Sequence, residues 1–238
     1  MRNVHAQTIQ WRLTKSMKAI ARRLLPEVII HEVQQYRMYE KNERALYLKI
    51  KLLDRTRILN PKRVNLPQTA RSFLFVCFGN IMRSPMCEAF MKRALKEFPN
   101  TQITVTSAGL NAVPGRSAHP WAITAARHFG INLENHHAQL LTIEMIAQAD
   151  AIFIMDYQNR VQLLSRHPRS REKVFMLSAY ADKDYRLVEI HDPYFSDEDG
   201  TRKCYEILDT CISNLIKSLA LETKTENLAD LKVSKIKN

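Results

Sequence analysis

Apolar residues near the start of the chain recur at helical spacing. Five of them are three or four residues apart and fall on one helix face: Ile9, Leu13, Met17, Ile20 and Leu24. Pro26 ends or kinks this helix. A second helical segment is predicted from about Glu27 to Arg57, and Asn60-Pro61 and Leu66-Pro67 mark a linker after it. The pattern predicts a mostly helical N-terminal extension over residues 1–70.

From residue 71 short apolar runs alternate with segments of helical character. The predicted strands are Ser72–Phe78, Ile103–Thr106, Ala151–Met155 and Val174–Leu177, with Ser107-Ala108-Gly109 stopping the second. The predicted helices are Pro85–Phe98, Pro120–Phe129, Tyr157–Arg166 and Thr201–Leu221. Such alternation predicts an α/β domain, over residues 71–222, with a parallel sheet covered by helices on both faces. Its ligand should bind beyond the carboxyl ends of the strands.

Composition excludes several protein classes. The 238 residues are 45% hydrophobic and 25% charged with 5 Gly, which argues against disordered and fibrous proteins. Four cysteines in a chain of this length indicate a reduced, cytoplasmic protein rather than a disulfide scaffold. We expect neither a standard secretion signal nor a membrane-spanning helix, because no apolar run approaches about 18 residues.

The net charge of +12 is concentrated in the extension. Residues 1–70 contain 15 Lys/Arg and 5 Asp/Glu, residues 71–222 contain 17 of each, and the polar, disordered tail predicted at 223–238 contains 4 and 2. An anionic membrane surface or an acidic partner is therefore a candidate for contact with residues 1–70, making the protein peripheral to the membrane. A solvated basic helix without a partner is the alternative, and no nucleic acid is expected.

Candidate chemistry follows the first strand, in the sequence Cys-Phe-Gly-Asn-Ile-Met-Arg-Ser-Pro that begins at Cys77. Between a strand and a helix, backbone N–H groups of such a loop point at an anion. The guanidinium of Arg83 can bind two phosphoryl oxygens, and the same positive field favours the thiolate of Cys77. Ser84 can donate a hydrogen bond to the sulfur. Gly79 permits a tight path, and Asn80 is among the few non-glycine residues that tolerate a left-handed backbone. The loop residues are Phe78, Gly79, Asn80, Ile81 and Met82.

Phosphoryl transfer through cysteine also needs a proton donor for the leaving oxygen. Asp192 is the candidate, because Pro193 stiffens a loop that can hold the carboxyl group over the site. Tyr194 and Phe195 can flank an aromatic substrate.

These motifs resemble one known family. The run from Cys77 to Glu88 is similar to the signature loop of the low-molecular-weight protein tyrosine phosphatases. The family's order is also followed by Ser107-Ala108-Gly109, Gly115…His119-Pro120, Gly130-Ile131-Asn132…His136, Asp150…Met155-Asp156 and Asp192-Pro193-Tyr194.

The resemblance covers about residues 71–222 and implies a four-stranded parallel sheet, no metal and no cofactor. It implies a protein-tyrosine phosphatase that acts through a cysteinyl-phosphate, with Cys77 as nucleophile, Arg83 as phosphate clamp, Ser84 as thiolate stabiliser and Asp192 as general acid. Asn80, Ser107 and His136 match a supporting hydrogen-bond network. The expected partner is a tyrosine-phosphorylated protein, with a tyrosine kinase as one candidate.

The chain departs from the family pattern at two positions. Met82 replaces a second loop cysteine, so a loop-internal disulfide with Cys77 is not expected. Ala112 stands where many relatives have tryptophan, which leaves one wall of the aromatic slot open to question. Ile81, in contrast, resembles the phosphotyrosine-directed members, since the arginine-phosphatase branch tends to have threonine there.

Two alternatives remain at this point. An arsenate reductase of the same fold needs resolving cysteines that reach Cys77, and the candidates are Cys87, Cys204 and Cys211. A phosphotyrosine-binding module without turnover would be expected to have lost the nucleophile or the acid, and this chain retains both.

Overall fold

A computed structural model describes residues 36–37, 39–58, 66–67, 69–182 and 189–219. The predicted amphipathic helix over Ile9–Leu24 lies outside these residues. The chain forms two compact units, Met1–Asp54 and Arg55–Asn238, and each is described by itself.

The described part of the extension contains helix α3 (Lys41–Ile58). The continuous helix predicted from Glu27 is wrong in this part, because the backbone is non-helical at Tyr39 and Glu40. The side chain of Glu43 accepts a hydrogen bond from the Glu40 N–H at 3.3 Å, which favours a new helix start there.

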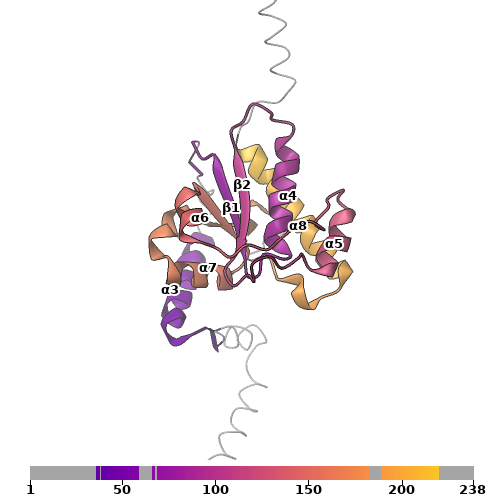
Figure 1. The fold of residues 1–238 in the computed structure, drawn as a ribbon. Coiled ribbons are helices and arrows are strands. Elements are labelled where there is room, and N and C mark those ends of the chain that lie inside the picture. Colours follow the sequence, from indigo (N-terminus) through magenta and orange to yellow (C-terminus); the bar gives the residue numbers. More distant parts are fainter. Residues whose placement is uncertain (1–35, 38, 59–65, 68, 183–188, 220–238) are drawn as a thin grey trace, which may run out of the picture. The chain divides into compact units, whose positions relative to one another are not determined.

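The sheet of the second unit, of which Figure 1 labels β1 and β2, is parallel throughout and has the order β2-β1-β3-β4. Its strands are β1 (Ser72–Cys77), β2 (Thr104–Gly109), β3 (Ala151–Ile154) and β4 (Val174–Met176). The apolar runs of β1 and β3 are buried on both faces, as expected for central parallel strands. The predicted α/β fold class is confirmed.

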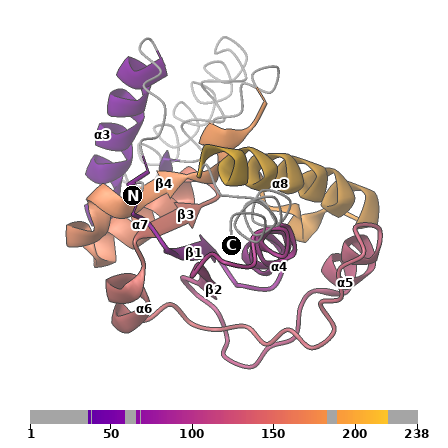
Figure 2. The ribbon, with the colours of Figure 1, turned by 90° about the horizontal axis from the view of Figure 1, so that it is seen from above.

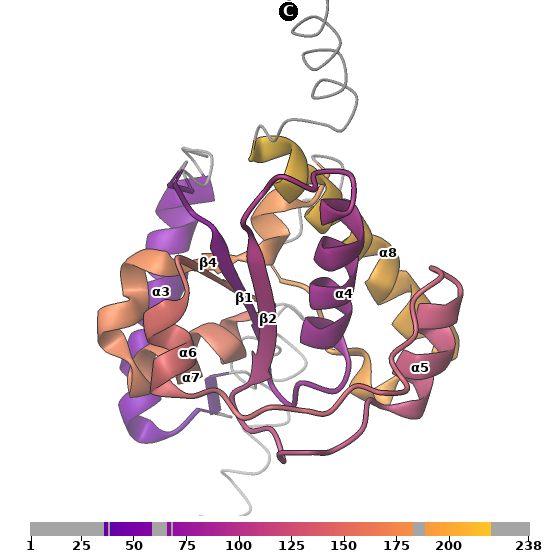
Figure 3. The ribbon, with the colours of Figure 1, turned by 45° about the horizontal axis from the view of Figure 1, so that its top comes forward.

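Helices cover both faces of this sheet, as Figures 2 and 3 show, with α4 and α8 on one face and α6 and α7 on the other. The helices are α4 (Arg83–Leu95), α5 (Pro120–Arg127), α6 (Ile143–Gln148), α7 (Tyr157–Arg166) and α8 (Glu198–Ser218). Three 3₁₀ helices complete the described elements: η1 (Pro168–Lys173), η2 (Leu177–Tyr180) and η3 (Pro193–Phe195). None of the described helices is both long enough and apolar enough to cross a membrane.

Several predicted boundaries are wrong. Ser107-Ala108-Gly109 does not stop the second strand but forms its carboxyl end. Helix α4 begins at Arg83 rather than Pro85, so the arginine lies in its first turn. The terminal helix begins at Glu198, because Asp197 caps it through the Gly200 N–H at 2.8 Å. The short helix α6 was not predicted.

Asp150 joins the starts of the two central strands. Its Oδ2 accepts hydrogen bonds from the N–H groups of Arg71 at 2.8 Å and Ser72 at 2.9 Å. Its own N–H donates to the Ser72 carbonyl at 2.9 Å. This contact fixes β3 beside β1 at the end of the sheet opposite to the carboxyl ends of the strands.

Candidate active site

The loop that follows β1 lies where β1 is flanked by β2 on one side and β3 on the other. Asn80 in this loop has a φ of 53°, a left-handed conformation that asparagine tolerates better than most residues. Asn80 thus adopts the left-handed conformation that its residue type was expected to tolerate.

The close backbone approach that requires glycine lies beside the loop, at the end of β2. A Cβ atom on Gly79 would meet only the Ile81 side chain, at 3.5 Å, and the φ of Gly79 is not positive. A Cβ atom on Gly109, at the end of β2, would lie 2.7 Å from the Asn80 nitrogen and 2.9 Å from the Phe78 oxygen. The close approach of two backbones thus requires glycine at Gly109 and not at Gly79.

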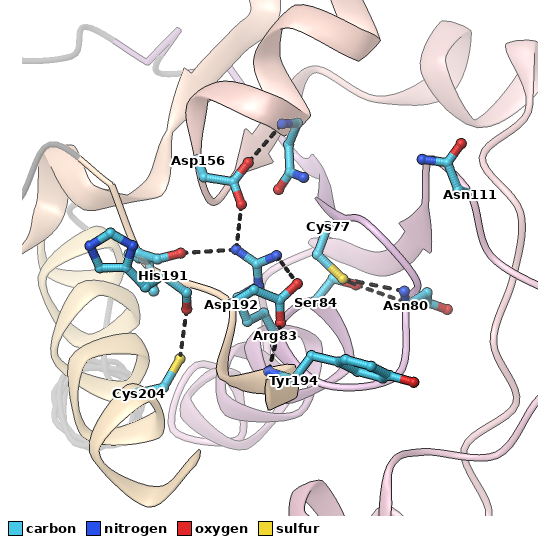
Figure 4. Close-up of polar contacts among 12 residues, drawn as sticks. Cys77, Asn80, Arg83, Ser84, Asn111, Asp156, His191, Asp192, Tyr194 and Cys204 are labelled. Atoms are coloured by element: carbon cyan, nitrogen blue, oxygen red, sulfur yellow. Dashed lines mark hydrogen bonds and ion pairs between the residues drawn. The ribbon is translucent and has the colours of Figure 1, made fainter. Parts of the chain in front are cut away.

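The sulfur of Cys77 has polar contacts with two residues, Asn80 and Ser84 (Figure 4). The Asn80 N–H donates to Sγ at 3.3 Å, and the Ser84 hydroxyl lies 3.1 Å from it. The Asn80 side-chain amide donates to Ser84 Oγ at 2.8 Å. Because Ser84 Oγ accepts this bond, its single hydrogen is directed at Cys77 Sγ or at the Ala108 carbonyl, 3.2 Å away. The site therefore supplies donors suited to a thiolate.

A second layer of hydrogen bonds holds Asn80, which is fully buried. Its side-chain amide donates to Ser107 Oγ at 2.9 Å, and its Oδ1 accepts from the Gln139 N–H at 2.8 Å. His136 Nε2 donates to the Asn80 carbonyl at 2.7 Å, and Ser107 donates to Glu88 at 2.5 Å. The structure thus brings the predicted supporting residues, Asn80, Ser107 and His136, together around the loop.

Arg83 is 1% exposed and lies between two carboxylates (Figure 4). One terminal nitrogen donates to Asp156 at 2.6 Å and to the Ile190 carbonyl at 2.9 Å, and the other pairs with Asp192. Burial opposes its charge, but the negative charges of Asp156, Asp192 and Cys77 outweigh burial and raise the pKa of Arg83. Its Nε is buried and has no hydrogen-bond partner among the described residues. That N–H is therefore available to an anion.

The predicted acid and the two aromatic residues lie on one turn. Asp192 caps η3 by accepting a hydrogen bond from the Tyr194 N–H at 3.2 Å, and its side chain is 38% exposed. The rings of Tyr194 and Phe195 are 5.0 Å apart, and Phe195 is 95% exposed. This turn presents a carboxylate and apolar surface next to the arginine.

The remaining loop residues differ in their surroundings. Ile81 and Met82 are buried, whereas Phe78 is partly exposed. The Met82 carbonyl accepts a hydrogen bond from the hydroxyl of the buried Tyr205 at 3.2 Å. Ala112 is buried in the core.

The other cysteines are poor candidates for redox partners. Cys87, Cys204 and Cys211 are buried free thiols. Burial is the main cause that raises the pKa of Cys204 and Cys211 to about 12, and burial also raises that of Cys87. Protonated thiols are weak nucleophiles, so these residues are unsuited to resolve a modified Cys77.

No cluster of three or more histidine, cysteine or carboxylate side chains suitable for a metal ion occurs in the described parts of the chain.

Three contacts of the site were not predicted from the sequence. Asp156 pairs with Arg83, Glu88 accepts from Ser107, and Tyr205 supports the loop at Met82. Asp156 had a usable signal, because it follows a buried strand next to β1 and the carboxyl ends of parallel strands meet at one edge. Glu88 contacts Ser107 in β2 and Tyr205 contacts Met82 in the loop, both from helices through tertiary packing, for which the sequence has no local pattern.

Comparison with known proteins gives a consistent result. The family model described as "Low molecular weight phosphotyrosine protein phosphatase" matches residues 72–225. A probable low molecular weight protein-tyrosine-phosphatase EpsP of Ralstonia nicotianae is 37% identical over 124 residues, which are 52% of this chain and 79% of that protein.

Solved structures are similar over the same region. The Erwinia amylovora tyrosine phosphatase AmsI has a TM-score of 0.57 at 31% identity and covers 64% of this chain and 95% of its own. A YwlE arginine phosphatase, a mutant with a phosphorylated active-site serine, also has a TM-score of 0.57 at 31% identity, covering 62% and 95%.

Proposed function

The chain belongs to the low molecular weight phosphotyrosine protein phosphatase family and is an enzyme of this class, and we propose that it hydrolyses phosphotyrosine on proteins through a cysteinyl-phosphate. The unpartnered Nε of the buried Arg83, close to a sulfur that is surrounded by donors, carries this proposal. A phosphoryl group bound there would place its phosphorus next to a nucleophile and its oxygens on a guanidinium.

Substrate binding begins with an exchange of partners at Arg83. Its Nε and the terminal nitrogen now paired with Asp192 form one edge of the guanidinium. Two phosphoryl oxygens that bind this edge displace Asp192, while Asp156 and the Ile190 carbonyl continue to hold the other nitrogen. Asp192 is then free to face the leaving group.

In the first chemical step Cys77 Sγ attacks phosphorus, and the bond from phosphorus to the tyrosine oxygen breaks. Once displaced from Arg83, the Asp192 carboxylate takes up a proton from solvent and then gives it to that oxygen, so the leaving group departs as neutral tyrosine. The loop N–H groups and Arg83 stabilise the charge that develops on the phosphoryl oxygens.

In the second step water attacks the phosphorus of the cysteinyl-phosphate, and Asp192 takes a proton from it. The sulfur leaves as a thiolate, stabilised by the Asn80 N–H and by the hydroxyl of Ser84. Inorganic phosphate is released, and no external oxidant or reductant takes part.

Phosphotyrosine is favoured over the other substrates of this fold. The exposed rings of Tyr194 and Phe195 suit an aromatic leaving group. Arsenate reduction would need a reactive second thiol, and the three other cysteines are buried and protonated. Because a similar structure is described as an arginine phosphatase, the rates on phosphotyrosine and on phosphoarginine must be compared to identify the substrate.

A four-substrate assay tests the proposal. Purified full-length protein is given a phosphotyrosine peptide, the phosphoserine and phosphoarginine peptides of the same sequence, and arsenate with a thiol reductant. We expect phosphate release from the phosphotyrosine peptide to be at least about tenfold faster than from the others. Faster phosphate release from the phosphoarginine peptide, or reduction of arsenate, would refute the proposal that phosphotyrosine is the substrate.

The intermediate is tested separately. Acid quench during turnover of a labelled substrate should leave phosphate on Cys77, and Cys77→Ser should bind inorganic phosphate but release none from substrate. Unchanged turnover in this variant would remove Cys77 from the mechanism.

For residues 1–70 we propose contact with an anionic membrane surface, with cytoplasmic localisation of the enzyme. The excess of ten positive charges supports this, because each basic residue near an acidic surface contributes about 1 kcal/mol. Full-length protein should sediment with phosphatidylserine vesicles at low salt and be released at high salt. A lack of binding at low salt would reject the proposal.

A further inference from the structure

Helix α5 begins with an unusual cap. The N-cap residue is His119, whose Nδ1 accepts a hydrogen bond from the Trp121 N–H at 3.2 Å. Serine, threonine, aspartate and asparagine are the residues that normally fill this position, and any of them would supply the same acceptor with a smaller side chain. Capping alone therefore does not explain the imidazole.

The imidazole has a second contact, on the turn that contains the acid. Its ring centroid lies 5.4 Å from that of Tyr194, with a tilt of 60° between the planes. The backbone N–H of His119 also donates to the carbonyl of Ile81, in the phosphate loop, at 2.9 Å. One residue thus contacts the phosphate loop, the start of α5 and the acid turn.

Tyr194, which His119 contacts, is itself hydrogen-bonded to the acid. Its N–H donates to Asp192 Oδ1 at 3.2 Å, which fixes the carboxylate relative to the turn. A phosphoryl group that binds Arg83 displaces Asp192 from it. Of the polar contacts described for the Asp192 carboxylate, the hydrogen bond from the Tyr194 N–H then remains to orient it. The packing of the Tyr194 ring then determines how well that orientation is kept.

We propose that His119 is a positioning residue, whose ring holds Tyr194 and thereby keeps the Asp192 carboxyl group directed at the leaving oxygen. This inference rests on the proposed function, since it concerns the acid of that reaction. It assigns to this chain's imidazole a role that a carboxylate or hydroxyl cap lacks, because those side chains have no ring to pack on Tyr194.

The charge state of the imidazole agrees with this role. Because Nδ1 accepts a hydrogen bond, the ring proton of the neutral form is on Nε2. Burial and the charge of Arg116 lower the pKa of His119, and they outweigh the opposite effect of Asp192. A neutral ring adds no charge that would compete with Arg83 for the acid.

His119→Asn is the variant that separates the ring from the cap. Asparagine caps helices well and keeps the backbone bond to Ile81, so the variant loses only the ring contact. His128→Asn is the matched control, because His128 ends the same helix, is exposed and pairs with Glu198 at 3.2 Å, not with Tyr194 or Asp192. Thermal unfolding should show that both variants are folded.

The readout is the dependence of kcat/KM on the leaving group. Loss of acid positioning should slow a poor leaving group, phenyl phosphate, about three- to tenfold. A good one, 4-nitrophenyl phosphate, should change less than about twofold, because it departs with little help from an acid. The same change in a Tyr194→Ala background should have no further effect, and His128→Asn should match the parent protein.

Equal slowing of both substrates, or no slowing at all in His119→Asn, would overturn the inference. Asp192→Ala, measured in the same assay, distinguishes failure of the positioning role of His119 from failure of the proposed acid. Strong leaving-group dependence in Asp192→Ala with none in His119→Asn rejects the positioning role alone. A lack of such dependence in Asp192→Ala rejects the acid of the proposed function, and the role of His119 with it.

Discussion

Gly109→Ala should damage the phosphate loop although Gly109 is not part of it. The added methyl group would point at the loop backbone, 2.7 Å from the Asn80 nitrogen and 2.8 Å from the Gly79 carbonyl carbon. The strand cannot easily retreat. The Gly109 N–H donates to Gln139 and its carbonyl accepts from Leu141, both at 2.9 Å. The loop must therefore move instead.

The required movement is about 0.7 Å, the difference between 2.7 Å and the 3.4 Å at which ordinary contact begins. A misplacement of 1 Å at a catalytic group costs about 100-fold in rate, so we expect kcat/KM to fall by about 10- to 50-fold. Overpacking at this position should lower the free energy of unfolding by about 1–3 kcal/mol.

Val105→Ala in the same strand is the control, because it should lower stability by a similar 1–3 kcal/mol or so without touching the loop. Urea unfolding and turnover of an aryl phosphate are measured for both variants. Equal activity of Gly109→Ala and the parent protein would refute the steric reasoning. An equal loss of activity in Val105→Ala would show that stability, and not loop position, sets the rate.

Three further predictions concern stability and are measured by urea unfolding. Asp156→Ala should lower the free energy of unfolding by about 2–4 kcal/mol, because it removes a carboxylate from buried Arg83 and the cap of α7; a loss below about 1 kcal/mol would contradict this. Asn80→Gly should remain more stable than Asn80→Ala by about 1–2 kcal/mol, since the φ of 53° favours glycine, and the reverse order would be evidence against strain at this position. Burial raises the pKa of Cys204 and Cys211 from 9.0 to about 12, so the folded thiols keep protons that the unfolded chain loses. Stability should therefore be complete below about pH 9 and fall between pH 9 and 12, by up to about 1.4 kcal/mol per pH unit for each thiol. The double alanine variant should show a shallower fall, and a parallel fall would contradict the burial argument.

Much of the fold could be predicted because its signals are local. The four apolar runs are short, β-branched or aromatic, and separated by helical segments, which leaves a parallel sheet as the simplest arrangement. Element boundaries depend on tertiary pairing. Ser107-Ala108-Gly109 has the composition of a turn, and it is in β2 only because β1 and the chain near Leu140 pair with it.

The candidate site divides in the same way. Cys77, Arg83 and Ser84 lie within one short stretch, so their proximity follows from the sequence. The steric role of Gly109 and the pairing of Asp156 with Arg83 depend on which strands become neighbours, and spacing along the chain does not give strand order. The second role of His119 depends on the path of the turn at Tyr194, some 75 residues later, which no local motif encodes.

The hydrogen bonds of Asp150 also limit how far the chain can be shortened toward β1. A fragment that starts at Ala70 retains both backbone N–H groups that donate to the Asp150 carboxylate. A fragment that starts at Phe73 lacks both of these donors. We therefore expect a steep further loss of stability once a truncation reaches Arg71 and Ser72, beyond the loss of the packing of Leu66 and Ala70. The first residues of β1 are thus held by one side chain that lies far downstream in the chain.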